Sequence, residues 1–414
     1  MSKIRSILNL PIWVILFAGF IPIDMLNGVL IRGGGPSVSF AFKLIVLGIV
    51  CIHLIRSRYR VLTIFCIATV FFYLALHTLI LKDIRSAMVG IDFWIKFTSI
   101  ILFFLFFSLK VQSHKCEYII TIAKAAFFFL FLNTIIGLLG LGFPMYSSGG
   151  VGIGTRGLIF AGNELGGALL ASSFILLVHY FSQGKIKYFT IISLCSLIMS
   201  ASMTSKVSIL GILILVSLIP LVYMFNTSRG LILEKKAFYF NFAAFGFFPV
   251  VVSIFAYIAL YKSGLFDRIV HLNESGIMMA LLSARDIWAR EAMQAYLEVF
   301  SFYQILFGMG FEWFEYISQN KSVEIDPIDF LLSYGIFGLF LSYFFFLWVI
   351  VFSILFNSNG WSNYVGFFCF LLVCVSFTSG HILYSGTAGF LFAAAFSLVY
   401  SRKEASFEKN ATHI

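Results

Sequence analysis

Two arginines, Arg156 and Arg285, are the residues of this chain best suited to bind a phosphate group. Arg156 lies at the end of a glycine-rich stretch, residues 143–157, in which glycines allow the backbone to approach a ligand closely. Arg285 lies in residues 283–300, where apolar residues recur with helical spacing. A guanidinium binds phosphate oxygens in bidentate fashion, so these side chains could hold a lipid-linked diphosphate. The alternatives are an anchor to lipid headgroups for Arg156 and a solvated helix on the membrane for Arg285.

Polar residues that follow Arg156 extend the same candidate site. Asn163 and Glu164 lie one to two turns into the next apolar stretch, and a buried glutamate is costly unless it is paired. We expect Arg156 or Lys206 to be the partner of Glu164. Lys206 follows a tight turn and is either a headgroup anchor or a second phosphate ligand.

Residues 283–300 predict an amphipathic helix, with Arg285 one turn before its apolar stripe. Trp288 and Arg290 are further candidate substrate contacts on this helix. Arg290 is four residues after Asp286, so an ion pair between them is its simplest explanation. The predicted stripe consists of Trp288, Ala292, Ala295, Tyr296 and Val299.

Three acids, Glu324, Asp326 and Asp329, are gathered at the start of a later apolar stretch. Asp326 before Pro327 predicts a helix N-cap with proline at the first helical position, and Asp329 completes a pattern like a capping box. One cap explains one or two of the acids but not three. We therefore expect one of them to bind a sugar or to take its proton. His381 could also be a base, although an interfacial histidine that is only solvated is the simpler interpretation.

An integral membrane fold must position these residues. Hydrophobic residues make up 61% of the chain and charged residues 11%, and the mean hydropathy is +1.00, which excludes a soluble globular domain. We expect one all-α polytopic membrane domain over residues 1–414, with about twelve transmembrane helices. The predicted spans are residues 8–27, 38–55, 61–81, 93–109, 117–142, 158–181, 188–204, 207–225, 237–261, 328–356, 361–378 and 382–400.

The distribution of positive charge predicts the orientation of the spans. Alternate loops hold 15 of the 28 Lys and Arg residues, whereas the short loops between them hold five. Both chain ends are therefore expected in the cytoplasm, and residues 262–327 form one large external loop that contains the amphipathic helix. The ionisable residues near the predicted outer ends of the spans are Asp24, Lys43, His77, Lys96, Glu164 and Lys206.

Other readings of the composition are weaker. The net charge of +10 would suggest nucleic acid for a soluble protein, but here it reflects topology and attraction to anionic lipid, so we expect no nucleic-acid partner. The six cysteines lie in or beside apolar spans without CxxC spacing, which indicates free buried thiols. We find no metal site in the sequence.

The order of these motifs resembles the Wzy-type O-antigen and capsule polymerases and their relatives, the O-antigen ligases. The resemblance spans about residues 150–340. Its motifs are Arg156 with Phe160 and Gly162-Asn163-Glu164, then Thr204-Ser205-Lys206, Ser283-x-Arg285-x-x-Trp288, Phe307-Gly308-x-Gly310, Glu324-x-Asp326-Pro327-x-Asp329 and Tyr334-Gly335-x-x-Gly338.

The resemblance implies a membrane glycosyltransferase of the GT-C class in the bacterial inner membrane, with its active site facing the periplasm. It implies inverting transfer of a growing glycan from undecaprenyl diphosphate to a lipid-linked repeat unit, with no cofactor. Arg285 and Arg156 would hold the diphosphate, assisted by Lys206. The substrates are undecaprenyl-diphosphate-linked oligosaccharides, and a chain-length regulator and a flippase are candidate protein partners.

Two departures from the family pattern matter. Lys206 stands where arginine is usual, so its phosphate contact would not be bidentate. Ligases carry a His-Asn pair before the glycines of the tenth span, where this chain has its acidic cluster, which favours a polymerase over a ligase. A lipid-linked oligosaccharide flippase is the third hypothesis, but it should need a polar path through the membrane midplane, and the predicted spans are nearly free of charge there.

Overall fold

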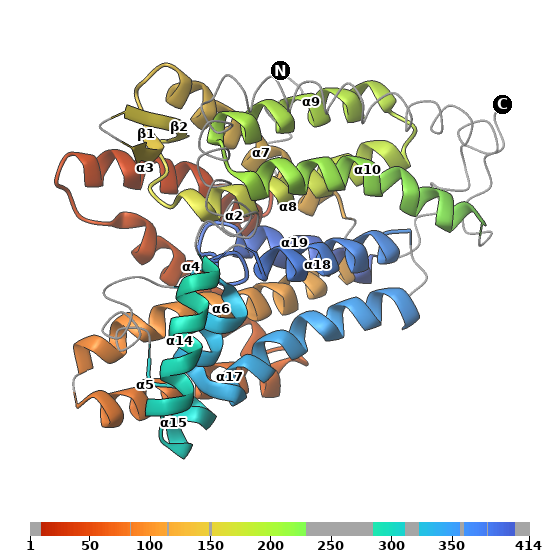
Figure 1. Ribbon diagram of the computed structural model, residues 1–414. Coiled ribbons are helices and arrows are strands. Elements are labelled where there is room, and N and C mark those ends of the chain that lie inside the picture. Colours follow the sequence, from red (N-terminus) through yellow and green to blue (C-terminus); the bar gives the residue numbers. More distant parts are fainter. Residues whose placement is uncertain are drawn as a thin grey trace.

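The computed structural model describes residues 10–82, 84–113, 116–148, 151–228, 285–310, 323–356, 360–378 and 380–401. Within these ranges the regular structure is helical apart from one two-stranded hairpin (Figure 1). The helices are α2 (Ile12–Ala18), α3 (Phe20–Arg32), α4 (Val38–Ile55), α5 (Arg60–Leu81), α6 (Ile84–Ser113), α7 (Glu117–Leu138), α8 (Gly162–Ser182), α9 (Ile186–Met203), α10 (Lys206–Ser228), α14 (Arg285–Val299), α15 (Phe302–Phe307), α17 (Asp326–Val351), α18 (Ser362–Ser376) and α19 (Gly389–Ser397).

The chain is an all-α integral membrane protein. Among the described residues, seven helices are long and apolar enough to cross a membrane, or eight if the bent pair α2–α3 is one span. Three shorter apolar helices, within α10, α18 and the region of α19, lie at further predicted spans. The predicted span 237–261 lies outside the described residues.

The last predicted span, residues 382–400, is wrong over its first seven residues, 382–388. Residues 380–388 are not helical, and α19 begins only at Gly389. We call residues 380–388 the irregular segment. Its residues 382–385 are buried, so their backbone N–H groups need acceptors from elsewhere in the protein.

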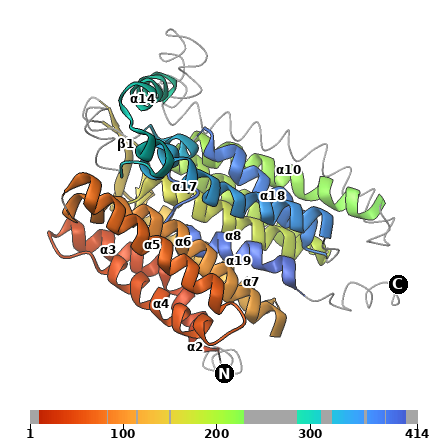
Figure 2. The ribbon, with the colours of Figure 1, turned by 90° about the horizontal axis from the view of Figure 1, so that it is seen from below.

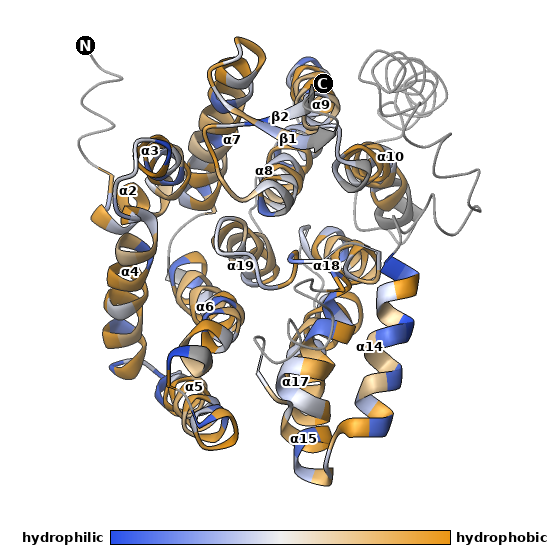
Figure 3. Ribbon diagram, turned by 60° about the vertical axis from the view of Figure 1, so that its left-hand side comes forward, coloured by the Kyte–Doolittle hydropathy of each residue, from blue (hydrophilic) through white to orange (hydrophobic). Residues whose placement is uncertain are grey.

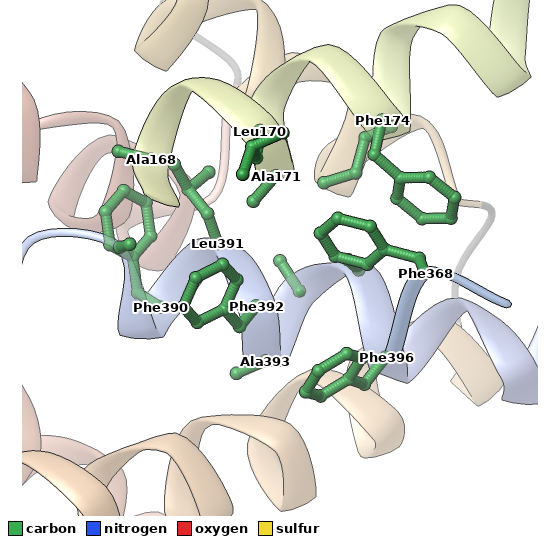
Figure 4. Close-up of a cluster of buried hydrophobic side chains, with 14 of the residues drawn as sticks. Ala168, Leu170, Ala171, Phe174, Phe368, Phe390, Leu391, Phe392, Ala393 and Phe396 are labelled. Atoms are coloured by element: carbon green, nitrogen blue, oxygen red, sulfur yellow. The ribbon is translucent and has the colours of Figure 1, made fainter. Parts of the chain in front are cut away.

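The core is arranged around α19. Every residue of α19 is buried, and α6, α8 and α18 surround it (Figure 3). Of the residues in an apolar stretch of α8, 83% are buried, against 22% in the corresponding stretches of α4 and α5. Helices α4 and α5 therefore lie at the periphery, with apolar faces toward lipid. Phe174 of α8 stacks on Phe368 of α18 at a centroid distance of 4.2 Å, above residues of α19 (Figure 4).

Two glycine motifs that are far apart in the sequence meet in one backbone contact. Gly335 interrupts α17 with φ 69° and ψ −172°. A Cβ atom there would lie 2.3 Å from the carbonyl carbon of Leu306, and one at Gly308 would lie 2.3 Å from that of Ser333. The N–H of Gly310 donates to Ser333 O at 3.0 Å. The chain after α15 therefore fits directly into the break of α17.

Residues 143–157, which the sequence predicts as a glycine-rich loop, form an antiparallel hairpin of β1 (Phe143–Ser148) and β2 (Val151–Gly157). Gly157 ends β2 with φ 60°, and a Cβ atom there would lie 2.3 Å from the carbonyl oxygen of Asn133 on α7. The hairpin and α14 lie at the same end of the bundle (Figures 1 and 2).

Candidate active site

The irregular segment is held in place by carboxylates from three helices. Both oxygens of Asp326 are used: they accept hydrogen bonds from the backbone N–H groups of His381 at 2.5 Å, Ile382 at 3.2 Å and Leu383 at 2.9 Å. The prediction that Asp326 caps its own helix is wrong, because α17 begins at Asp326 and the N-cap residue is Ile325. The fully buried carboxylate instead satisfies donors that no helix satisfies.

Glu164, at the start of α8, holds the later part of the same segment. Its Oε2 accepts the N–H of Thr387 at 2.7 Å and the hydroxyl of Ser385 at 3.2 Å, and its Oε1 lies 3.9 Å from Lys96 Nζ. The predicted pairing with Arg156 is therefore wrong. The cation that lies near this carboxylate is the partly buried Lys96 on α6.

Asp24 and Asp329 complete the set of buried acids. Asp24 on α3 accepts the hydroxyl of Thr387 at 2.8 Å and pairs with Lys43 at 2.7 Å. Asp329 accepts the N–H of Val323 at 3.1 Å and the hydroxyl of Tyr384 at 3.3 Å. These acids hold backbone and hydroxyl groups of the protein in place, and Glu324 is the most exposed member of the acidic cluster.

Arg285 and Glu324 form an ion pair at the edge of the irregular segment. Arg285 Nη2 lies 2.5 Å from Glu324 Oε2, and Arg285 Nη1 donates to the Thr378 carbonyl oxygen at 2.7 Å. The Glu324 side chain is 35% exposed, whereas that of Arg285 is 16% exposed. The pair can therefore be reached by a substrate.

The backbone at this pair is unusual. Glu324 and His381 both have positive φ, 56° and 65°, in a region that non-glycine residues rarely adopt and that is found most often at functional sites. Gly380 makes the approach possible, because a Cβ atom there would lie 2.5 Å from Glu324 Cα. The acid cluster and the chain at His381 therefore lie together, although the sequence analysis treated them only as separate candidates.

His381 lies between aromatic rings, 5.9 Å from Phe93 and 5.3 Å from Tyr384 by centroid distance. Burial lowers the pKa of its imidazole, and the nearby Glu324 carboxylate opposes this only in part. The ring is partly buried between these side chains and is therefore not merely solvated.

Arg156 occupies the end of the hairpin. Its guanidinium lies over the rings of Phe143 at 5.5 Å and Phe160 at 5.1 Å, and Nη1 donates to Phe160 O at 2.6 Å. Its buried Nε atom makes no hydrogen bond within the described part of the chain. Burial lowers the pKa of this guanidinium because it disfavours the charged form, and a bound anion would stabilise that charge. We note that no described acid pairs with it.

Asn133, which the sequence analysis missed, fixes the backbone on both sides of Gly157, directly after Arg156. Its amide donates to the Arg156 carbonyl oxygen at 3.0 Å, and its side-chain oxygen accepts the N–H of Leu158 at 2.8 Å. A buried asparagine in an apolar span was the available signal. The sequence did flag Asp24, Lys43 and Lys96 as ionisable but gave them no common site.

The turn before Lys206 packs against the hairpin. Thr204 has φ 52°, and a Cβ atom at Gly154 would lie 2.2 Å from its Oγ1 atom. The structure therefore brings the segments of Arg156 and Lys206 together. The side chains of Lys206 and Asn163 lie outside the described part of the structure.

Helix α14 confirms the predicted amphipathic helix, but its apolar side packs on protein. Ala292 and Tyr296 are buried with a cluster that includes Ile325, whereas Val299 is 59% exposed. Arg290 is exposed and the predicted ion pair with Asp286 is not formed, since Asp286 Oδ1 is buried without a hydrogen bond. Trp288 is half-buried.

Arg285 and Arg156 make no contact with each other in the described ranges. The irregular segment connects their surroundings, since its beginning approaches Glu324 and its end is bound by Glu164, two residues after Gly162 opens α8.

Comparison with known proteins gives one match. A family model described as "O-antigen ligase like membrane protein" matches residues 266–404, which include α14, α15, α17, α18 and α19. No curated protein matches the chain, and no solved structure does. This part of the chain is therefore similar to that family, in agreement with the resemblance that the motifs indicate.

Proposed function

We propose that this protein polymerises lipid-linked glycan repeat units. It would transfer the growing glycan from undecaprenyl diphosphate to a lipid-linked repeat unit, at the outer face of the bacterial inner membrane, with inversion. The observation that carries the proposal is the accessible Arg285–Glu324 pair beside the irregular segment, which lies within the region matched by the family model.

The arginines would stabilise the leaving group. As the glycosidic bond breaks, negative charge grows on the bridging phosphate oxygen, and a fixed cation beside it lowers the energy of the transition state more than that of the ground state. Arg156 suits this role because its Nε is unused and its charge has no described acidic partner. Lys206 would assist from the adjoining turn.

Glu324 would take the proton from the attacking hydroxyl. In the absence of substrate, its carboxylate is neutralised by Arg285 at 2.5 Å. A diphosphate that binds Arg285 would compete for the guanidinium and release Glu324 to act as a base. Donor binding would therefore prepare the site for the acceptor.

The test of the proposed function is Arg285→Ala in a strain that lacks the chromosomal gene. We expect normal amounts of protein in the membrane but no long glycan chains, with a loss in rate on the order of 10²–10³ per contact. Gln294→Ala is the matched control, because Gln294 is exposed on the same helix and its side chain, among the described residues, bonds to Glu298 alone. A full-length glycan ladder in the Arg285→Ala strain would refute the mechanism.

A ligase is the second candidate, favoured by the description of the matching family model. The two activities differ in what a deletion strain accumulates. Loss of a polymerase leaves single repeat units on the final acceptor, whereas loss of a ligase leaves long chains on undecaprenyl diphosphate. Analysis of both lipid fractions separates the two functions.

A further inference from the structure

A cavity of about 330 Å³ lies between α3, α4, α6 and the start of α8, and residues Gly386 and Thr387 of the irregular segment form part of its wall. Its volume is in the range of sites for small molecules. Its lining combines charged and apolar side chains. The charged residues are Asp24, Lys43, Asp92, Lys96 and Glu164, and the apolar residues include Phe20, Phe40, Leu44, Leu47 and Phe103.

The charges of this cavity disfavour an anion. Its three carboxylates exceed its two ammonium groups, and both ammonium groups are already paired, Lys43 with Asp24 and Lys96 with Asp92, each at 2.7 Å. A phosphate would need donors only. A sugar hydroxyl both donates and accepts, so a neutral sugar suits the mixed lining.

Three polar groups of the lining remain able to bind a ligand. Asp92 and Lys96 are 32% and 27% exposed, and Asp92 pairs through one oxygen only. The Asn27 oxygen is used by Ser37 and by the N–H groups at the start of α4, which leaves its NH₂ group to donate. By contrast, Asp24 and Glu164 are committed to Thr387.

Aromatic rings supply flat surfaces at the same cavity. Phe40 is 50% exposed and Phe160 is 52% exposed, although both line it. Phe160 also lies under the Arg156 guanidinium. A sugar bound here would therefore lie beside the group proposed to hold the diphosphate.

The irregular segment links this cavity to Glu324. A Cβ atom at Gly386 would lie 3.3 Å from Lys96 Cε, and one at Gly380 would lie 2.5 Å from Glu324 Cα. Six residues of chain span at most about 20 Å. The ends of the segment that approach the cavity and Glu324 are therefore no more than about 20 Å apart, a distance that an oligosaccharide of several sugars could cover.

We propose that this cavity binds a neutral sugar of the acceptor glycan, with Asp92, Lys96 and Asn27 contacting its hydroxyls. This inference rests on the proposed function and names the acceptor site within it.

The test uses the full chain in lipid nanodiscs, with the radiolabelled lipid-linked repeat unit of the host as acceptor. We expect Asp92→Asn and Leu47→Trp to raise the KM for the acceptor about 10-fold, with the KM for the donor unchanged. The matched control is Ile49→Trp, since Ile49 lies on the same helix, is 47% exposed and does not line the cavity.

A photo-crosslinking amino acid in place of Phe40 gives a direct readout. We expect a sugar-containing adduct that is suppressed by the free repeat-unit saccharide but not by inorganic diphosphate. An adduct with phospholipid alone would overturn the inference. So would a parental acceptor KM in both cavity variants while Arg285→Ala abolishes polymerisation, whereas polymer made by Arg285→Ala would instead refute the proposed function.

Discussion

At the scale of single residues, the acids of one short sequence cluster do different work. Asp326 is completely buried and accepts three backbone hydrogen bonds, whereas Glu324, two residues earlier, is partly exposed and holds one arginine. Burial and the number of donors, rather than residue type, separate a positioning residue from a candidate base.

We predict that two amide substitutions change different properties, one the stability of the protein and the other its activity. Asp326→Asn weakens the hold on the irregular segment, and each buried N–H left without an acceptor costs about 1–3 kcal/mol, so the free energy of unfolding falls. Glu324→Gln leaves it nearly unchanged, because a partly exposed ion pair contributes about 0–1 kcal/mol, but it abolishes polymerisation. Thermal unfolding in detergent, together with glycan ladders, measures both. The reverse pattern would exchange the two roles.

His381 should make stability depend on pH. Its folded-state pKa is lowered from 6.5, so the unfolded chain binds the proton more tightly. Its contribution is therefore present above about pH 6.5 and is lost as the pH falls from there through the lowered folded-state pKa. His381→Asn should remove this component while tolerating the positive φ, since asparagine enters that region readily. Unfolding curves between pH 5 and 8 would contradict this if parent and variant respond alike.

At the scale of elements, two interruptions of helices determine where the backbone around the candidate site lies. The break at Gly335 receives the chain at Gly308, and the irregular segment delays α19 until Gly389. Both features bring residues that are distant in the sequence into contact.

We predict that Gly335→Ala disrupts this contact. The residue has φ 69°, and the added methyl would lie 2.3 Å from backbone, so we expect a loss of several kcal/mol or failure to accumulate. Gly48→Ala in α4 is the control, because nothing lies within 4 Å of its Cβ position and alanine favours a helix by up to about 1 kcal/mol. Membrane abundance and thermal unfolding report the difference. Equal behaviour of the two variants would show that the packing at Gly335 is not required.

The sequence predicts elements better than it predicts partners, and the reason is physical. Apolar runs such as 38–55 coincide with helices because a bilayer requires helices of that length. The run 382–400 was wrongly predicted as one helix. The backbone N–H groups at its start donate to carboxylates more than fifty residues away in the chain, such as Asp326, instead of to carbonyl groups of a helix. Likewise Glu164 was recognised as needing a partner, but only the fold could choose Lys96 over Arg156.

At the scale of the whole molecule, the hairpin that carries Arg156 and the helix α14 that carries Arg285 lie at one end of the bundle (Figure 2). The charge bias of the loops predicts that this end faces outward.

Cysteine mapping tests this orientation. In a cysteine-free background, Glu291→Cys on exposed α14 should react with a membrane-impermeant maleimide in intact spheroplasts. Lys185→Cys, in an exposed loop predicted to be cytoplasmic, should react only after permeabilisation. Labelling of the two sites in the opposite order would place the proposed chemistry in the wrong compartment.

The irregular segment also constrains how the protein is assembled. Its acceptors belong to α3, α8 and α17, all of which are synthesised before it. Until the ribosome delivers residues 380–388, those carboxylates have no such donors, and until the earlier helices have gathered, the newly made backbone has no acceptors. Helix α19 should therefore pack against the other helices last in folding. Chains that end before it should be degraded by membrane quality-control proteases.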